Sequence, residues 1–361
     1  MAPATQKMLG VPEVGKPWQL YTDWPVPTPG PNDVLVKIVS AALNPADWRI
    51  QENFMGVSIL AKKWPFIGGL DGAGIVEEVG SEVSTFAKGD KVIVPGGFEQ
   101  EYATFQQYNI GPAENIARIP ENISFDEAAT LPVALCTVVT GIWAHEPGAR
   151  SVNFPAPWEE GGRTKFAGKA AFIVGGSGSV GQMAIQLARL QGFSPIITTA
   201  SLRNEDWLKS LGATHVIDRT LPDEAILAEI PKLTRGEPIV YAFDAVGFEQ
   251  SQQLAYNALS PGGAIVTVNP AADAALKEKV QRDGSAKTVG CCYGDLRIPP
   301  HRKLGVELCS RLTEWLEKGI IVPNRVEVIP GGLLGAPEGC ERIKHNKVSG
   351  VKLVVHPQET E

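Results

Sequence analysis

The chain has little cysteine and histidine, with five of each among its 361 residues. The cysteines are odd in number and none of them shows the C-x-x-C spacing; they are Cys136, Cys291, Cys292, Cys309 and Cys340. This pattern offers neither a disulfide framework nor a cysteine-rich zinc site. The scarcity of cysteine therefore indicates a reduced chain in the cytoplasm.

An excess of positive charge is also absent. The sequence has 33 Lys and Arg against 40 Asp and Glu, which gives a formal net charge of -7. Such a balance argues against broad affinity for nucleic acid or for an anionic membrane, although a local basic pocket for one phosphorylated ligand remains compatible with it. No uninterrupted apolar stretch is long enough to span a bilayer, and the first residues lack the apolar core of a signal peptide. We expect neither a nucleic-acid nor a membrane partner.

Two patterns divide the chain. Short strand-like runs separated by turns occupy the first part, at residues 34–41, 74–79 and 91–94, and predict a β-rich partial barrel. From about Thr137 onward, helices alternate with apolar strands, which is the pattern of a doubly wound parallel sheet. The sequence thus predicts an α/β protein with two domains, and its length is sufficient for two cores.

We place the first domain at residues 1–136, completed by residues 300–361, and the second at residues 137–299. A helix is expected at residues 302–317, and a final strand at 350–355 is expected to return to the first domain. Residues 147–165 are rich in Pro, Gly and polar side chains, so we expect an insertion loop there.

A glycine-rich segment follows the apolar run 170–174 and precedes a helical pattern at 182–190. Alone, a G-x-G-x-x-G sequence can be only a turn, but this strand and helix are the context of a dinucleotide-binding fingerprint. We assign Gly176 to the tight turn, Gly178 to the approach of a pyrophosphate and Gly181 to helix packing. The loop and helix start that face the phosphates also contain Ser177, Ser179 and Val180.

The residues after the second strand predict which dinucleotide binds. An NAD site has a carboxylate there for the ribose 2′-hydroxyl, but this segment contains Ser201, Arg203 and Asn204. A hydroxyl, a guanidinium and an amide suit a 2′-phosphate, and Arg219 after the next strand can join them. The alternative is a solvated helix start with Arg203 on the surface. We predict NADPH as the cofactor.

Several motifs together resemble one family over essentially the whole chain. They are the segments 44–47 (NPAD), 68–74 (GGLDGAG), 88–92 (KGDKV), 128–132 (AATLP) and 244–247 (DAVG). In order and spacing, they resemble the medium-chain dehydrogenase/reductase superfamily. The resemblance implies a GroES-like β-rich domain followed by a Rossmann domain.

Departures from the zinc enzymes of that superfamily concern the metal ligands. Zinc alcohol dehydrogenases carry a His-Glu pair where this chain has Leu70 and Asp71, and a cysteine that is missing from residues 44–49. A catalytic zinc needs about three nitrogen or sulfur ligands. The resemblance is therefore to the zinc-independent branch, and we predict no metal site.

Within that branch, the chain resembles fungal trans-acting enoyl reductases of polyketide biosynthesis. This resemblance implies NADPH-dependent reduction of the C=C bond of an α,β-unsaturated thioester, with an acyl-carrier-bound substrate and a polyketide synthase as partner. Two alternatives remain open. One is a zinc-independent quinone or 2-alkenal reductase that acts on small electrophiles, and the other is a non-catalytic NADPH-binding protein.

The resemblance also implies roles for particular residues. The Thr137 hydroxyl is expected near the nicotinamide, and Arg49 either stabilises an enolate or is a surface salt-bridge partner. Asp47 and Trp48 resemble a turn that faces the cofactor. Further contacts to the nicotinamide carboxamide are expected from Val268 and Asn269.

Other conspicuous residues are expected to be structural. Asp71 is expected to hold a barrel turn and Asn44 to form one. Phe54 and Met55 occupy the region where some enoyl-thioester reductases carry a proton-donating Tyr, so protonation is expected from solvent.

Overall fold

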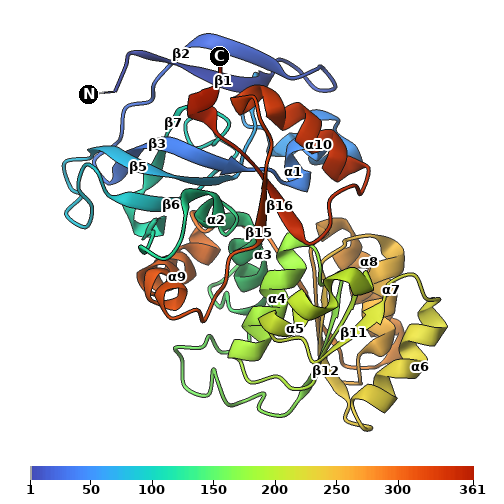
Figure 1. Ribbon diagram of the computed structural model, residues 1–361. Helices are drawn as coiled ribbons and strands as arrows, with labels where there is room; N and C mark the ends of the chain where they lie inside the picture. The colour runs from blue at the N-terminus through green and yellow to red at the C-terminus, as the bar shows by residue number, and fades with distance from the viewer. Residues whose placement is uncertain (1) are drawn as a thin grey trace. The chain divides into compact units, whose positions relative to one another are not determined.

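The computed structural model describes residues 2–361, except for the side chains of residues 270–274. The chain forms two compact units (Figure 1). The first comprises Met1–Val133, Gly305–Gly319 and Pro323–Glu361, and the second comprises Ala134–Leu304 and Ile320–Val322. Both main boundaries of these units fall inside helices, in α3 (Pro132–Ile142) and α9 (Pro299–Glu317).

The first unit is β-rich. Its larger sheet has the order β15-β16-β3-β5-β6-β8, with β7 also paired to β3, and its smaller sheet has the order β2-β1-β4. The strands of the larger sheet are β3 (Asp33–Ala42), β5 (Asp71–Val79), β6 (Lys91–Pro95), β7 (Tyr108–Pro112), β8 (Ala117–Arg118), β15 (Arg325–Val328) and β16 (Val351–Val355). The smaller sheet contains β1 (Thr5–Val11), β2 (Gln19–Pro25) and β4 (Phe66–Ile67).

Alternation along these strands builds the core of the first unit. Val34, Val36 and Ile38 point inward from β3 and lie in one buried cluster with Val76 of β5 and Val94 of β6. The expected return of the last strand is confirmed, because β16 pairs with β3. Besides most of α9, this unit contains the helices α1 (Pro45–Gln51), α2 (Phe125–Ala129) and α10 (Ala336–Lys344), with short 3₁₀ segments η1 (Phe54–Leu60), η2 (Ala113–Asn115), η4 (Gly332–Gly335) and η5 (Pro357–Glu359).

The second unit contains a six-stranded parallel sheet with the order β11-β10-β9-β12-β13-β14. Its strands are β9 (Ala170–Val174), β10 (Ile196–Ala200), β11 (His215–Asp218), β12 (Ile239–Asp244), β13 (Ala264–Thr267) and β14 (Thr288–Cys291). Its remaining helices are α4 (Ser179–Leu190), α5 (Glu205–Leu211), α6 (Asp223–Leu233), α7 (Glu249–Ala258) and α8 (Pro270–Asp283), with η3 (Leu202–Asn204). Figure 1 shows α4 and α5 on one side of the sheet and α6, α7 and α8 on the other.

This strand order is that of the doubly wound dinucleotide fold, with a switch point between β9 and β12. The predicted fold class, a GroES-like β-rich domain with a Rossmann domain, is therefore confirmed.

The insertion at residues 147–165 consists of turns and irregular chain, as expected. It is nevertheless part of the core of the second unit. The Phe154 ring lies 4.4 Å from that of Phe166 and 5.4 Å from that of Tyr241, and Trp158 packs edge-on against Trp143. Aromatic packing of this kind anchors the insertion to the sheet.

One stretch, Phe125–Ile142, is apolar and long enough to cross a membrane, although we expected no such stretch. It joins α2 to α3, and 72% of it is buried inside the protein. The core helix of a protein outside the membrane can be equally long and apolar, so the length and composition of this stretch are weak evidence for a membrane.

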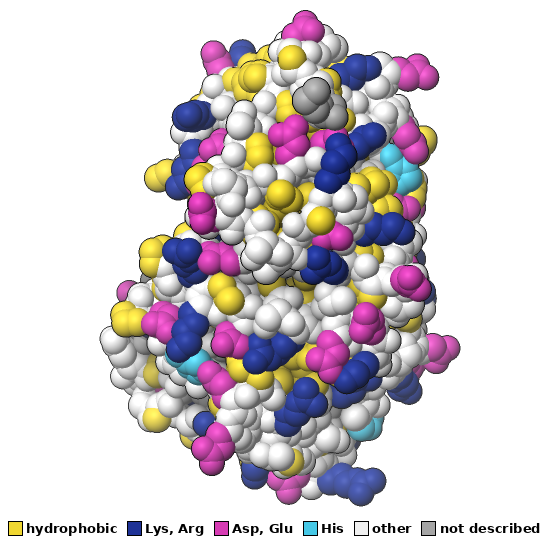
Figure 2. All heavy atoms as spheres, turned by 90° about the vertical axis from the view of Figure 1, so that its left-hand side faces the viewer, with side chains coloured by type: hydrophobic (Ala, Val, Ile, Leu, Met, Phe, Trp, Pro, Cys, Tyr) yellow, Lys and Arg dark blue, Asp and Glu magenta, His cyan; other side chains and the backbone are white. Residues whose placement is uncertain are grey.

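On the face drawn in Figure 2, Lys and Arg side chains are interspersed with Asp and Glu.

Candidate active site

The glycine-rich loop has the shape that a dinucleotide site needs. Gly175 has a φ of +82°, so the left-handed turn falls on Gly175 and not on the expected Gly176. A Cβ at Gly176 would stand 2.1 Å from Thr198 Oγ1, and one at Gly181 would stand 2.2 Å from the Gly175 oxygen. A Cβ at Gly178 would meet only the Gly175 oxygen, at 3.5 Å. The loop is therefore packed tightly at 176 and 181 and is open at 178.

Helix α4 begins at the open side of this loop. Gly178 is its N-cap and has no side chain with which to cap the first turn, formed by Ser179, Val180 and Gly181. Ser177 precedes the cap, and its carbonyl accepts a hydrogen bond from Gln182 Nε2. Amide groups and the positive end of the helix dipole favour a phosphate at such a start. The residues present thus fit a dinucleotide pyrophosphate.

The ends of β10 and β11 carry the residues predicted to bind a 2′-phosphate. Ala200 pairs with Asp218, and the Arg219 amide donates to the Ala200 carbonyl, so Ser201 and Arg219 follow adjacent parallel strands. Arg203 and Arg219 are exposed, and neither forms an ion pair with a residue that the structure describes. Hydrogen bonds lower the pKa of the neighbouring Asp218, and the charge of Arg219 adds to this effect. Two guanidinium groups near one edge of a sheet suit a phosphate.

The neighbouring polar groups are already engaged. The Asp218 carboxylate accepts hydrogen bonds from the Thr220 amide and hydroxyl, at 2.9 and 2.8 Å. Asn204 is 3% exposed, so it is buried beside the exposed Arg203. Asp218 therefore closes its own turn, and Arg203 is the more accessible group on the segment after β10.

The ends of β12 and β13 are tied together. Asp244 accepts from the amides of Val246 and Gly247, both at 3.1 Å, and its burial raises its pKa to about 6. Asn269 donates through Nδ2 to the Gly247 carbonyl at 2.9 Å. Val268 is half-buried beside this link. The Asn269 side chain thus ties the loop after β13, where the nicotinamide contacts were expected, to the loop after β12.

Thr137 lies in helix α3 and is half-buried. Its carbonyl accepts a hydrogen bond from Thr140 Oγ1, whereas its own hydroxyl has no hydrogen-bond partner among the described residues. Gly294 lies against it, since a Cβ at 294 would stand 3.0 Å from Thr137 Oγ1. Nothing in the sequence pattern singled out Gly294, because this approach depends on the tertiary fold.

Asp47 is fully buried in the turn that begins α1. Its two oxygens accept from the amides of Asn44 at 2.7 Å and Gly69 at 2.9 Å. Burial raises its pKa to about 7, against the opposing effect of these two hydrogen bonds. Asp47 therefore holds the turn, which differs from the cofactor contact that we expected of it.

Trp48 and Arg49 have unsatisfied polar groups. The indole Nε1 of Trp48 and the Nε of Arg49 are buried without a hydrogen-bond partner among the described residues. The guanidinium carbon of Arg49 lies 5.7 Å from the Trp48 ring and 5.7 Å from the Phe54 ring, and burial lowers the pKa of Arg49. Because Arg49 has no ion-pair partner among those residues, the salt-bridge alternative is not supported.

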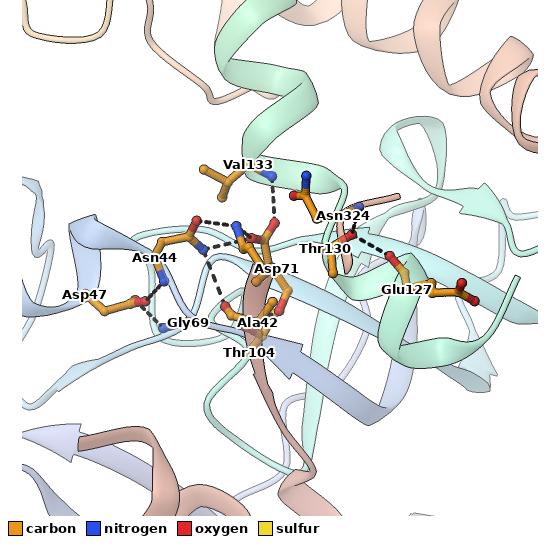
Figure 3. Close-up of polar contacts among 11 residues, drawn as sticks. Ala42, Asn44, Asp47, Gly69, Asp71, Thr104, Glu127, Thr130, Val133 and Asn324 are labelled. Carbon is orange, nitrogen blue, oxygen red and sulfur yellow. Dashed lines mark hydrogen bonds and ion pairs between the residues drawn. The ribbon is translucent and has the colours of Figure 1, made fainter. Parts of the chain in front are cut away.

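Asp71 is the centre of a buried polar network, drawn in Figure 3. Its Oδ1 accepts from the Val133 amide at 2.6 Å, and its Oδ2 accepts from Asn44 Nδ2 at 2.8 Å and from Lys352 Nζ at 2.7 Å. Lys352 Nζ also donates to Asn44 Oδ1 at 2.7 Å. The structural role expected of Asp71 agrees with these contacts. Lys352 was missed, although a single Lys within the apolar strand β16 was a signal that could have found it.

Within residues 2–361, apart from the masked side chains, no three His, Cys, Asp or Glu side chains form a group able to hold a metal. The adjacent Cys291 and Cys292 are buried, as expected, and burial raises the pKa of Cys292 well above its ordinary value. The Cys292 thiol is therefore a poor nucleophile. Independence from zinc stays a prediction.

Comparison with known proteins agrees with this description. Residues 30–121 match the alcohol dehydrogenase GroES-like domain, and residues 179–303 match the zinc-binding dehydrogenase family. The chain is 32% identical to the trans-enoyl reductase RAP2 of Pyricularia oryzae over 92% of each protein. It is 30% identical to a zinc-type alcohol dehydrogenase-like protein of Schizosaccharomyces pombe, over 93% of this chain and 96% of that protein.

Among solved structures, the quinone oxidoreductase of Coxiella burnetii superposes with a TM-score of 0.74 at 25% identity, over 97% of this chain and 98% of that one. The chain belongs to the medium-chain dehydrogenase/reductase superfamily. It is accordingly an oxidoreductase of the kind that uses a nicotinamide cofactor.

Proposed function

We propose that this protein is an NADPH-dependent enoyl reductase that reduces the C=C bond of an α,β-unsaturated thioester. The observation that carries the proposal is the half-buried Arg49, which forms no ion pair with a described residue and is framed by Trp48 and Phe54. A desolvated cation without a carboxylate partner suits negative charge that appears during a reaction. Relatives named trans-enoyl reductases support the same reaction class.

The bound cofactor would supply a hydride to the β-carbon of the substrate. Addition there moves the π electrons onto the thioester oxygen, and the Arg49 guanidinium would stabilise this enolate by hydrogen bonding. The α-carbon then takes a proton. Because Phe54 and Met55 carry no titratable group, we assign that proton to water.

Other residues would bind and orient the cofactor. The open loop at Gly178 and the start of α4 would take the pyrophosphate, and Ser201, Arg203 and Arg219 would take the 2′-phosphate. The hydroxyl of Thr137, which has no hydrogen-bond partner among the described residues, would orient the nicotinamide. These assignments favour NADPH over NADH because neither arginine forms an ion pair with a described residue.

We further propose that the enoyl chain is carried by an acyl carrier protein of a polyketide synthase. Lys62 and Lys63 are exposed and form no ion pair with a described residue, so they offer positive charge to an acidic carrier. A second basic pair, Arg302 and Lys303, is a less suitable docking site for the carrier, since Lys303 Nζ lies 3.5 Å from Glu146 Oε1. Contacts to a remote carrier can be used to orient the reacting carbons.

A parallel assay distinguishes this function from its alternative. NADPH oxidation is measured with a crotonyl thioester, a carrier-bound enoyl chain, a quinone and a 2-alkenal. We expect the thioesters to be reduced with the highest kcat/KM and the carrier-bound chain to exceed the free thioester. A quinone that is preferred by a large factor would support the second candidate, favoured by the likeness to a quinone oxidoreductase. Oxidation with none of the four would reject both.

A further inference from the structure

The ion pair of Asp71 and Lys352 is almost completely shielded from water. The Asp71 side chain is 0% exposed and that of Lys352 is 4% exposed. Lys352 Nζ contacts Asp71 Oδ2 and Asn44 Oδ1, both at 2.7 Å, and the Asn44 amide closes the triangle by donating to Asp71 Oδ2. All three side chains belong to the first unit.

Stability alone does not account for such a pair. The cost of removing two charges from water offsets most of their attraction, and well-packed apolar replacements are often as stable. Removing one partner alone is strongly destabilising because an uncompensated charge stays buried. A buried pair can instead define one arrangement of the segments that it joins.

The first segment that Asp71 holds is the start of α3. Pro132 has no amide hydrogen, so Val133 provides the first donor of that helix, and this donor bonds to Asp71 Oδ1. The positive end of the helix dipole also stabilises a carboxylate at this position. Thr137 lies about one turn further along the same helix.

The second segment is the turn before α1. Asn44 is the N-cap of that helix, and its side chain is held on one side by Asp71 and on the other by Lys352. Its backbone amide donates to the buried Asp47. Arg49 follows within the same short helix.

We propose that Lys352 is a positioning residue for the reduction: through Asp71 and Asn44 it fixes the first turns of the two helices that carry Thr137 and Arg49. The assignment of those two residues rests on the proposed function. Lys352 Nζ bonds to Asp71 and Asn44, so it would act by holding these two side chains in one arrangement.

The test compares two variants with the intact protein. In the double variant D71N/K352M, both charges are removed together, and an Asn oxygen can still accept from the Val133 amide. In K352R, the charge is kept. The control is K347M, which removes an exposed Lys five residues away in the chain. Each is measured for Tm, for NADPH Kd and for kcat and KM with the acceptor that the wild type reduces fastest.

We expect D71N/K352M to keep a Tm close to that of the wild type and an unchanged NADPH Kd, while kcat falls about tenfold or more. K352R should recover a large part of kcat, and K347M should equal the wild type. An unchanged kcat in D71N/K352M would overturn the proposal. A kcat that falls only in proportion to a lowered Tm would also overturn it.

A second readout does not depend on activity. Amide hydrogen exchange of residues 130–142 reports the start of α3 directly, and we expect faster exchange there in D71N/K352M than in K347M. Equal exchange in the two variants would contradict the positioning role. If the wild type reduces a quinone in place of a thioester, the proposed function fails while both tests of Lys352 stand.

Discussion

Gly294 lies so close to Thr137 that a Cβ atom at position 294 would stand 3.0 Å from the threonine hydroxyl and 3.3 Å from its backbone nitrogen. No positive φ requires glycine at 294, so a larger residue there would be opposed by crowding against Thr137 and not by backbone strain. A side chain at 294 would therefore crowd the Thr137 hydroxyl, which has no hydrogen-bond partner among the described residues.

The first prediction tests that relationship. Gly294→Ala should crowd the Thr137 hydroxyl and lower kcat about tenfold, which corresponds to about 1.4 kcal/mol of barrier. Steady-state kinetics with saturating NADPH measures the effect. Thr137→Ser keeps the hydroxyl and serves as the control, with a smaller loss expected. Wild-type kcat in G294A would show that the hydroxyl does not need this space.

The second prediction concerns cofactor preference. Arg203→Ala and Arg219→Ala should each weaken NADPH binding while leaving NADH binding unchanged, because a 2′-phosphate is the group that NADH lacks. In the double variant the loss should reach at least tenfold, or about 1.4 kcal/mol. Fluorescence titration gives both Kd values. Arg282→Ala, on the exposed face of α8, is the matched control. Equal weakening of NADH would remove the basis for the 2′-phosphate assignment.

The third prediction concerns Arg49. Arg49→Met should lower kcat by about 10²- to 10³-fold, the range observed when one donor to a developing oxyanion is removed. Arg49→Lys should keep part of the activity, since charge remains while the planar donor geometry is lost. NADPH Kd should stay unchanged in both. Lys88→Met, which removes an exposed charge in the same unit, is the control. Wild-type kcat in R49M would rule out enolate stabilisation by Arg49.

The fourth prediction concerns pH. Asp47 has its pKa raised to about 7 in the folded protein, from an ordinary value of 3.8. The folded state therefore binds more protons than the unfolded state between these values, so unfolding free energy falls as pH rises from about 4 to about 7. Beyond the effect of burial, the charge of Asp71 raises the pKa of Asp47 further, and the ammonium of Lys352 lowers it.

Urea unfolding at several pH values measures this effect. Asp47→Asn cannot titrate, so the difference in stability between wild type and D47N should shrink as pH rises through this window. Asp244, with a pKa raised to about 6, is present in both proteins and cancels in the comparison. A difference that stays constant with pH would show that Asp47 is ionised throughout.

The fifth prediction concerns metal. Leu70 and Asp71 stand where zinc enzymes have a ligand pair, and Asp71 is engaged with Val133, Asn44 and Lys352. Exhaustive chelation should leave kcat and KM unchanged. Stoichiometric zinc by elemental analysis, with activity lost on its removal, would refute zinc independence.

The parts of this protein that could be predicted from the sequence depend on neighbours along the chain. The glycine loop between β9 and α4 is continuous, so turn, strand and helix could be identified together, with the left-handed turn misplaced by one residue. The strands were recognisable from apolar runs and alternation, because a pleated strand presents alternate residues to its core. The lack of a carboxylate directly after β10 could also be read from the sequence, because it concerns residues next to that strand in the chain.

Tertiary structure alone decided the electrostatics of the first unit. Lys352 and Asn44 are 308 residues apart in the chain, yet Lys352 Nζ lies 2.7 Å from Asn44 Oδ1. No repeating pattern in the sequence relates the two residues. Three further features likewise depend on which side chains fill the surrounding space: the burial of Asp47, the lack of an ion-pair partner for Arg49 among the described residues, and the approach of Gly294 to Thr137. Desolvation and ion pairing are set by these distant neighbours, so the sequence could name the charged residues without assigning them their roles.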